Sequence, residues 1–377
     1  MSWSLKLGRV AGIPIFVHWT FLILLGWIML AQWGQNHELT AALAGGLFLI
    51  TLFACVVLHE LGHALMAQRF GVPTSDITLL PIGGVARLQR IPEHPGQELA
   101  IAAAGPAVNV AIALVLYLGF GVPFPGTLDD AAHLERGAFW PRILEVNVFL
   151  VAFNLIPAFP MDGGRMLRAL LAMRLPYAKA TRLAASIGQA LAIGFAFVGI
   201  QSNPMLMLIA LFVWIGAEAE ARQVEDRMAL RGLRVRDAML TDFHTLNPSD
   251  SLGRAADLLL AGTQHDFPVA TPGDSEFRSI LTRADLMAGL ASAGRESPVS
   301  DHAVTELPAF DVSSDLEQAV ASLRDQQLRC LQVTERGRTV GLLSLENVGE
   351  FLLVRSALGG PESAPPGPGQ RLLAADA

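Results

Sequence analysis

Charged residues and cysteines are both scarce in this chain of 377 residues. Only 16% of the residues are Asp, Glu, Lys or Arg, whereas 52% are hydrophobic and the mean hydropathy is +0.44. Such values are unusual for a globular enzyme and are typical of a polytopic membrane protein that also carries a soluble part. The two cysteines, Cys55 and Cys330, lie far apart in the sequence, so a disulfide framework is not expected.

Positive charge is also scarce, and it forms no continuous basic run. The formal net charge is −7, and the sequence contains no block of basic residues. A nucleic-acid partner is therefore not expected. The first apolar stretch is long, lacks a small-residue cleavage site and is followed by further apolar segments, so no cleavable signal peptide is expected either.

Long apolar segments, by contrast, fill the first 221 residues. About six of them approach the ~20 residues that a helix needs to cross a bilayer: 15–33, 40–68, 98–121, 142–160, 181–201 and 204–221. Lys and Arg gather in alternate connecting segments, and such cations favour the cytoplasmic side. We therefore expect a multi-pass protein of the cell membrane with both termini in the cytoplasm.

The second of these segments contains the most informative motif of the chain. Residues 59–63 read His-Glu-Leu-Gly-His and follow an uncharged run from Leu43 to Leu58. On a helix this spacing places two imidazoles on one face, where they can bind Zn²⁺, and leaves the Glu free to accept a proton from the attacking water. Ionisable groups inside a membrane segment are rare and usually functional. The first hypothesis is therefore a zinc protease whose active site lies within the bilayer.

A carboxylate is expected to reach the same depth at the end of the fourth segment. Segments two and four run in the same direction across the membrane, and the fourth ends in Pro157, Pro160 and Asp162. Two His and one carboxylate form a catalytic zinc sphere that leaves a position open for water. We predict that His59, His63 and Asp162 are the zinc ligands.

Residues 73–90 interrupt the apolar pattern between the second and third segments. Pro73, Pro81 and the Gly83-Gly84 pair break this stretch, while Ile77–Leu80 and Val85–Leu88 are strand-like. We interpret the stretch as a re-entrant β-hairpin with one strand edge facing the site. Such an edge can bind an unwound substrate segment by β-augmentation.

These motifs together resemble the site-2 protease family of intramembrane zinc metalloproteases. The resemblance covers roughly residues 5–221 and rests on four segments: 59–63, 83–84, 104–109 (Ala-Gly-Pro-Ala-Val-Asn) and 154–165. It implies zinc on the three ligands named above, Glu60 as general base, and Asn154 as a residue that helps position the substrate or the developing oxyanion. It also implies cleavage of single-span membrane proteins, of which an anti-sigma factor is one type.

The remaining third of the chain has a different composition. After a linker at 222–234, two units of about sixty residues, 235–291 and 298–356, repeat the order of short strands, Thr/Ser-x-x-Asp/Asn and helix. This repeat resembles a tandem pair of CBS domains, which implies a cytosolic α/β module. The tail at 359–377 is rich in Gly, Pro and Ala and is expected to be disordered.

The resemblance to CBS domains also implies a cleft for ATP or AMP. Thr282 and Asp285 match the nucleotide-binding positions in the first unit, whereas in the second Ser344 matches and Asn347 replaces the carboxylate. A CBS pair can equally serve homodimerisation alone, and Thr282 and Asp285 can equally be helix-capping residues.

Two other classes of function remain open from the sequence. The first is a transporter or channel gated by a CBS pair, although the apolar segments contain one ionisable cluster with protease spacing and no relay across the bilayer. The second is an inert membrane scaffold, although Glu60 and the three predicted ligand positions are all filled. The expected architecture is thus a polytopic α-helical membrane protein of about six transmembrane helices with a re-entrant β-hairpin, followed by a cytosolic CBS pair.

Overall fold

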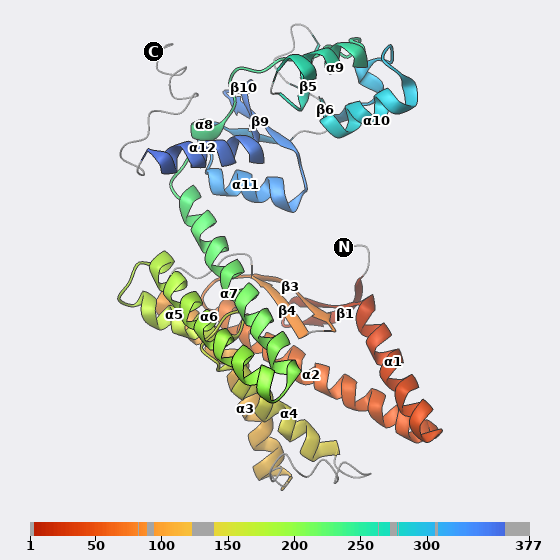
Figure 1. Cartoon of the computed structure of the whole chain (residues 1–377), viewed down its shortest axis with the longest axis vertical. Coiled ribbons are helices and arrows are strands. Elements are labelled where there is room, and N and C mark those ends of the chain that lie inside the picture. Colours follow the sequence, from red (N-terminus) through yellow and green to blue (C-terminus); the bar gives the residue numbers. More distant parts are fainter. Residues whose placement is uncertain are drawn as a thin grey trace. The chain divides into compact units, whose positions relative to one another are not determined.

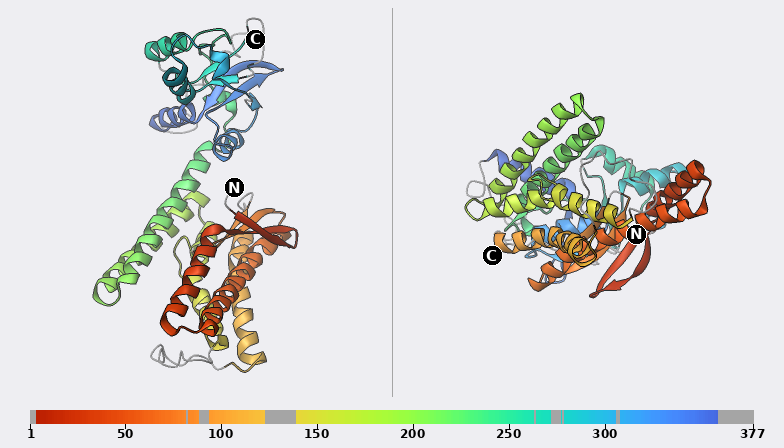
Figure 2. Two further views of the ribbon diagram at one scale, coloured as in Figure 1. Left: turned by 90° about the vertical axis from the view of Figure 1, so that its right-hand side faces the viewer. Right: turned by 90° about the horizontal axis from the view of Figure 1, so that it is seen from below.

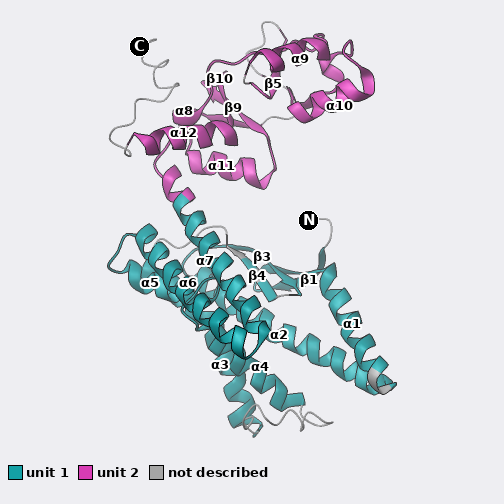
Figure 3. Ribbon diagram, in the orientation of Figure 1, with its two compact units in different colours: residues 1–225 teal, residues 226–377 magenta. Residues whose placement is uncertain are grey.

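The chain folds into two compact units, residues 1–225 and 226–377 (Figure 3). The structure is a computed structural model and describes residues 4–81, 83–88, 94–122, 139–262, 264–271, 277, 279–305 and 308–358. The predicted tail at 359–377 lies outside the described residues. The predicted domain boundaries at 221, 235, 291 and 298 stay predictions.

Helices make up most of the first unit (Figure 1). They are α1 (Trp19–Asn36), α2 (Leu39–Arg69), α3 (Pro95–Leu114, continued by a π-helical turn, Val115–Gly119), α4 (Phe139–Asn154), α5 (Asp162–Ala172), α6 (Tyr177–Gln201) and α7 (Pro204–Leu230). Four of them, α2, α3, α6 and α7, are long and apolar enough to cross a membrane. Large apolar side chains such as Leu118 and Ile200 are more than 70% exposed, as is expected of lipid-facing positions. The prediction of a polytopic helical membrane protein is confirmed, while the count of six spans stays a prediction.

The first predicted span begins too early. Residues 15–18 belong to an N-terminal β-hairpin, in which β1 (Ser4–Val10) pairs with β2 (Ile13–His18), and the helix begins only at Trp19. Alternate residues of β2, starting at Ile13, are buried, so the strand has the period of two that a half-buried strand requires. Directly before an apolar helix, this alternation is hidden in the continuous hydrophobic run.

The N-terminal hairpin is part of a four-stranded sheet in the order β1-β2-β3-β4. The strands β3 (Thr74–Leu80) and β4 (Gly83–Leu88) form an antiparallel pair, and β2 and β3 run parallel. Ile13 and Ile77 pack against Leu61 and Ala64, which fixes the sheet on α2. Figure 2 shows the sheet at one end of the helices of this unit. The strand-like pieces predicted at 77–80 and 85–88 therefore lie in adjacent strands, whereas the re-entrant placement of the hairpin stays a prediction.

The second unit contains two small sheets with helices packed around them. Its elements are α8 (Val235–Ala238), α9 (Leu252–Ala261), β5 (Phe267–Val269), β6 (Ser279–Leu281), α10 (Arg283–Ala293), a 3-10 turn (Val299–Asp301), β7 (Val304–Thr305), β8 (Ala309–Asp311), α11 (Leu316–Asp325), β9 (Cys330–Glu335), β10 (Arg338–Ser344) and α12 (Leu345–Ala357). One sheet has the order β5-β6-β7 and the other β10-β9-β8.

The first residues of each repeat pack in the hydrophobic core of the other repeat. Val235 and Met239, at the start of the first repeat, pack in the core of the second with Leu331. Val299, at the start of the second repeat, packs in the core of the first with Phe267. Because each core is completed by the other repeat, we expect the two repeats to fold as one cooperative unit.

Candidate active site

Two neighbouring histidines and an aspartate about a hundred residues further along the chain meet in the first unit. His59 and His63 lie one turn apart on α2, and Asp162 is the first residue of α5. The Nε2 atoms of the two histidines are 3.0 Å apart, and each lies within 3.2 Å of Asp162 Oδ2. The three residues are only 7–9% exposed, so the cluster is enclosed by the protein.

The cluster fits a zinc ion. Two imidazole nitrogens and one carboxylate oxygen are donors that zinc prefers, at bond lengths of about 2.0–2.2 Å. Ligand atoms at such bond lengths lie roughly 3.3 Å apart in a tetrahedron, which is close to the separations of 3.0–3.2 Å seen here. Within the described ranges, this is the one group of three such side chains close enough to hold a metal ion.

A glycine on α3 leaves room for the cluster. A Cβ on Gly105 would lie 2.1 Å from His63 Nε2 and 2.7 Å from His59 Nε2. On α2, which packs against α3, a Cβ on Gly62 would lie 2.7 Å from the carbonyl oxygen of Ala104. The Ala-Gly-Pro segment of α3 therefore owes its small residues to the close approach of α2 and to the space that the ligand atoms need.

The segment that carries Asp162 is held by tight backbone packing. Ala158, Phe159 and Met161 are at most 3% exposed. A Cβ on Gly163 would lie 2.3 Å from the carbonyl oxygen of Ile156, and one on Gly164 would lie 2.5 Å from the carbonyl carbon of Ala158. The two glycines thus allow the chain to fold back and begin α5 at the metal cluster.

Glu60 follows the first histidine on α2 and is half-buried. The backbone of β4 lies against it, because a Cβ on Gly84 would approach Glu60 Cγ to 2.7 Å. A side chain at position 84 would displace the carboxylate. The Gly83-Gly84 pair therefore brings the last strand of the described sheet directly alongside Glu60.

The asparagines differ in how closely they approach the cluster. Asn154 ends α4 and is half-buried, and the hydrogen bonds of the three ligand side chains do not go to it. Asn109 contacts the cluster directly, with its Oδ1 2.5 Å from His59 Nδ1. Behind it lies Asn147, 2.8 Å from Asn109 and fully buried. Asn147 belongs to no motif, so the sequence offered no signal that would single it out.

A second buried polar group lies on α5. Arg168 is 2% exposed, and its guanidinium pairs with Glu98 of α3 and Glu220 of α7 at 2.5 Å each. The guanidinium also lies over the rings of Phe159 and Tyr177, at 5.0 and 5.2 Å from their centroids. This triad joins α3, α5 and α7, and through Phe159 it reaches the segment before Asp162.

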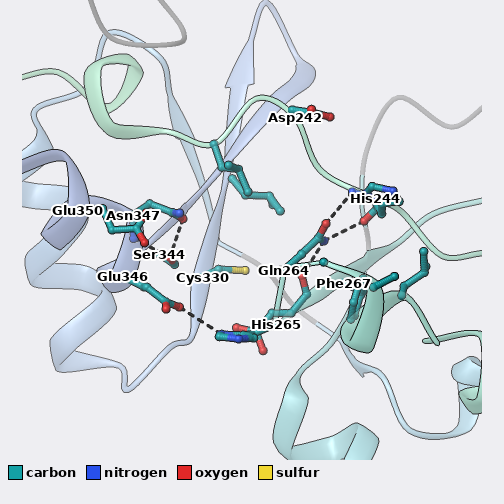
Figure 4. Close-up of a pocket in the computed structure, with 16 residues that line it drawn as sticks. Asp242, His244, Gln264, His265, Phe267, Cys330, Ser344, Glu346, Asn347 and Glu350 are labelled. Atoms are coloured by element: carbon teal, nitrogen blue, oxygen red, sulfur yellow. Dashed lines mark hydrogen bonds and ion pairs between the residues drawn. The ribbon is translucent and has the colours of Figure 1, made fainter. Parts of the chain in front are cut away.

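Two adjoining clefts mark the second unit. The first, of about 650 Å³, is lined on one side by the second repeat, including Ser344 and Asn347, and on the other by residues 240–267 (Figure 4). Among the described residues, four carboxylates and two histidines line it, without Lys or Arg: Asp242, Asp266, Glu346, Glu350, His244 and His265. The second, of about 760 Å³, shares Asp266, Ser344 and Glu346 and adds Arg324 and Arg329. Together the clefts are lined by apolar, acidic and basic side chains.

Cys330 lies in the first cleft with its thiol protonated. Burial, together with the negative charge of Asp266, raises the pKa of the Cys330 thiol to about 12. The thiolate is the form that binds metals and reacts as a nucleophile. Cys330 therefore contributes a neutral, largely apolar wall to this cleft.

Thr282 and Asp285 lie elsewhere, since they do not line either of these two clefts. Thr282 is the N-cap of α10: its Oγ1 accepts a hydrogen bond from the Asp285 backbone N–H and donates one to Asp285 Oδ2. Ser344 and Asn347 repeat this arrangement at the start of α12. The Thr/Ser-x-x-Asp/Asn pattern thus forms a helix cap in both repeats.

A histidine pair with a carboxylate, set among membrane-crossing helices, defines a class: membrane-embedded metalloendopeptidases. Comparison with known proteins agrees, because the model of peptidase family M50 matches residues 47–129 and 127–195, and the CBS domain model matches 235–292. The chain is 38% identical over 274 residues to zinc metalloprotease MJ0392 of Methanocaldococcus jannaschii, covering 72% of this chain and 77% of that protein. The chain therefore belongs to peptidase family M50, the site-2 proteases, and carries a CBS pair.

Two further matches cover smaller parts of the chain. The structure of a site-2 protease from M. jannaschii is 40% identical, with a TM-score of 0.43, over 58% of this chain and 96% of that one. CBS domain-containing protein YhcV of Bacillus subtilis is 28% identical over 113 residues, which is 29% of this chain and 79% of YhcV. The predicted family, enzyme class and CBS module are confirmed.

Proposed function

We propose that the protein is a zinc-dependent intramembrane endopeptidase that cleaves peptide bonds within transmembrane segments of other proteins. The observation that carries this proposal is the enclosed His59–His63–Asp162 cluster, with Glu60 beside it, in a unit of membrane-crossing helices. An isolated Asp near the membrane interior would cost about 2–3 kcal/mol, and coordination of a dication removes that cost. His59, His63 and Asp162 are accordingly the proposed zinc ligands.

Glu60 is the proposed general base. Zinc supplies the Lewis acid, which polarises the scissile carbonyl and lowers the pKa of the attacking water to about 7. Glu60 accepts the proton of that water and then delivers it to the nitrogen of the leaving amine. Gly84 leaves room for the Glu60 side chain, because a Cβ at position 84 would lie 2.7 Å from Glu60 Cγ.

Asn154 is the proposed partner of the substrate carbonyl. It lies at the end of α4, directly before the segment that leads to Asp162. A carboxamide N–H at such a position can donate to the oxygen that gains charge as the peptide bond is attacked. This role needs a donor without a stronger competing partner, and the hydrogen bonds of the three proposed ligands do not involve Asn154.

The outer edge of β4 is the proposed docking site for the substrate backbone. Among the described residues, β4 pairs with β3 alone, so one row of its backbone N–H and C=O groups faces away from the sheet. A substrate helix must unwind before cleavage, because its peptide groups are shielded by their own hydrogen bonds. Strand addition at this edge compensates for those lost bonds beside Glu60.

We further propose that both termini are cytoplasmic, that the substrates are single-span membrane proteins such as an anti-sigma factor, and that the CBS pair forms a homodimer. Alternation of Lys and Arg between the connecting segments supports the orientation.

An adenine nucleotide, ATP or AMP, is the proposed regulator. Thr282 and Asp285 remain the proposed contacts in the first repeat. The clefts beside Ser344 and Asn347 support binding at the second.

The decisive experiment compares wild type with Glu60→Gln in liposomes that contain a single-span test substrate, with bound zinc quantified in both. We expect both proteins to hold about one zinc per chain, and turnover by Glu60→Gln to fall by about 10²–10⁴-fold. Glu145→Gln, at an exposed carboxylate on α4, is the matched control and should cleave like wild type. If wild type holds no zinc, the protease proposal fails. If Glu60→Gln cleaves like wild type, Glu60 is not the base.

A further inference from the structure

The two histidine ligands are oriented by different kinds of partner. His63 Nδ1 lies 2.7 Å from the backbone carbonyl oxygen of Ile101. His59 Nδ1 lies 2.5 Å from Asn109 Oδ1. A neutral imidazole carries its proton on one nitrogen, and the partner of Nδ1 decides whether Nε2 is left free to bind a metal.

For His63 the outcome is fixed by the backbone. A carbonyl oxygen only accepts hydrogen bonds, so His63 Nδ1 carries the proton and Nε2 is free. For His59 the outcome is not fixed by Asn109 alone. A carboxamide has an accepting end and a donating end, and a rotated Asn109 would donate to Nδ1 and leave the proton on the nitrogen that faces the metal.

Asn147 removes this ambiguity. Its Nδ2 donates to the backbone carbonyl oxygen of Ile143 at 2.8 Å, which turns its Oδ1 toward Asn109. Asn109 must then present Nδ2 to Asn147, at 2.8 Å, and Oδ1 to His59. Both asparagines are fully buried, so water does not supply alternative partners.

We infer that Asn109 and Asn147 form a relay through which the Ile143 carbonyl oxygen fixes the tautomer of His59 that binds the metal. Both are positioning residues, because they act through His59 and do not touch the reacting atoms. The inference rests on the proposed zinc site and adds α4 to the elements that determine zinc affinity. It also assigns a role to Asn147, which no motif marks.

The test measures zinc affinity of the full chain in detergent by competition with a fluorescent chelator. Asn147→Leu frees Asn109 to rotate, and zinc affinity should fall by about 10–100-fold, as for other groups that orient a ligand. Asn147→Asp should stay within about threefold of wild type. As a neutral acid it donates to the Ile143 carbonyl and accepts from Asn109, so it preserves the direction of the relay.

A double-mutant cycle separates the relay from simple packing. In Asn109→Asp both side-chain oxygens accept, so His59 keeps its partner whichever way the carboxylate turns. Adding Asn147→Leu to that background should cost less than about threefold in zinc affinity. An equal loss in both backgrounds would show that Asn147 only fills space, and would overturn the relay.

Cys55→Ala is the matched control. Asn147 Nδ2 also contacts Cys55 Sγ, at 3.5 Å, but this contact is not needed for the direction of the relay. Zinc affinity should therefore not change. If Asn147→Leu does not fold, Asn147→Ala takes its place. If wild type binds zinc and Asn147→Leu binds it equally well, the relay is refuted and the proposed function is not. If wild type binds no zinc, the proposed function is refuted as well.

Discussion

The two units hold their polar functional groups in opposite ways. In the first unit the three side chains of the proposed metal cluster are almost fully buried, and each has neighbours within about 3 Å that fix its position. In the second unit the polar side chains line open clefts of 650 and 760 Å³, where Glu346 and His265 remain well exposed. A site that must hold a metal ion in place therefore depends on packing, whereas a site that admits and releases a ligand depends on surface groups.

The largest effect is expected where the packing around the ligands is tightest. Gly105→Ala places a methyl group 2.1 Å from His63 Nε2, so the histidines or α3 must move. We expect at least a hundredfold loss of zinc affinity, and of cleavage with it. Gly96→Ala on the same helix is the control, because nothing lies within 4 Å of its added methyl group. A Gly105→Ala variant with normal zinc affinity would show that this packing tolerates movement, and the comparison of the units would lose its main support.

The second effect concerns stability. Arg168→Leu leaves Glu98 buried without its partner, and one oxygen of Glu98 already has no hydrogen bond. Breaking such a buried pair costs about 3–5 kcal/mol in the free energy of unfolding. Arg182→Leu removes an exposed cation that pairs with Glu218 and Glu225, and should cost about 0–1 kcal/mol. Reversible unfolding in mixed micelles compares the two variants, and equal costs would contradict the contrast between buried and exposed charges.

These contrasts also explain what the sequence could predict. The approach of His59 and His63 was predictable because helical spacing alone brings them to one face, and that of Asp162 because the predicted direction of two spans places it at their depth. Their role as zinc ligands stays a prediction. The roles of Gly105 and Asn147 could not be predicted, because they depend on how α3 and α4 pack against α2. The β1–β2 hairpin was missed because its alternation merges with the following apolar helix.

The second unit was predicted less completely. Its repeat and its strands follow from local patterns, and the Thr/Ser-x-x-Asp/Asn motif was correctly placed before a helix. The positions of the clefts depend on how the two repeats pack together, including the exchange of Val235 and Val299 between cores. No local pattern encodes that arrangement.

An intermediate effect is expected in the clefts. Arg329 lines the cleft that adjoins Ser344, and a charge-assisted hydrogen bond to a phosphate contributes roughly 1.5–3 kcal/mol. Arg329→Ala should weaken AMP binding by about 10–150-fold in calorimetric titration of the full chain. Arg338→Ala, an exposed cation outside both clefts, should not change it. If Thr282→Val weakens AMP binding and Arg329→Ala does not, the nucleotide binds at the first repeat.

The smallest effect concerns Cys330, a buried ionisable group of the cleft wall. Because burial raises the pKa of Cys330 to about 12, the thiolate is scarce at pH 8–9, and alkylation of the folded protein should be slow in that range. In the unfolded chain the thiol has an ordinary pKa near 8.5 and should react readily at pH 9. Peptide-resolved mass spectrometry after iodoacetamide treatment measures both rates. Rapid alkylation of folded Cys330 at pH 8 would mean that this wall opens to water, and that even the buried groups of the second unit are held less firmly than those around His59.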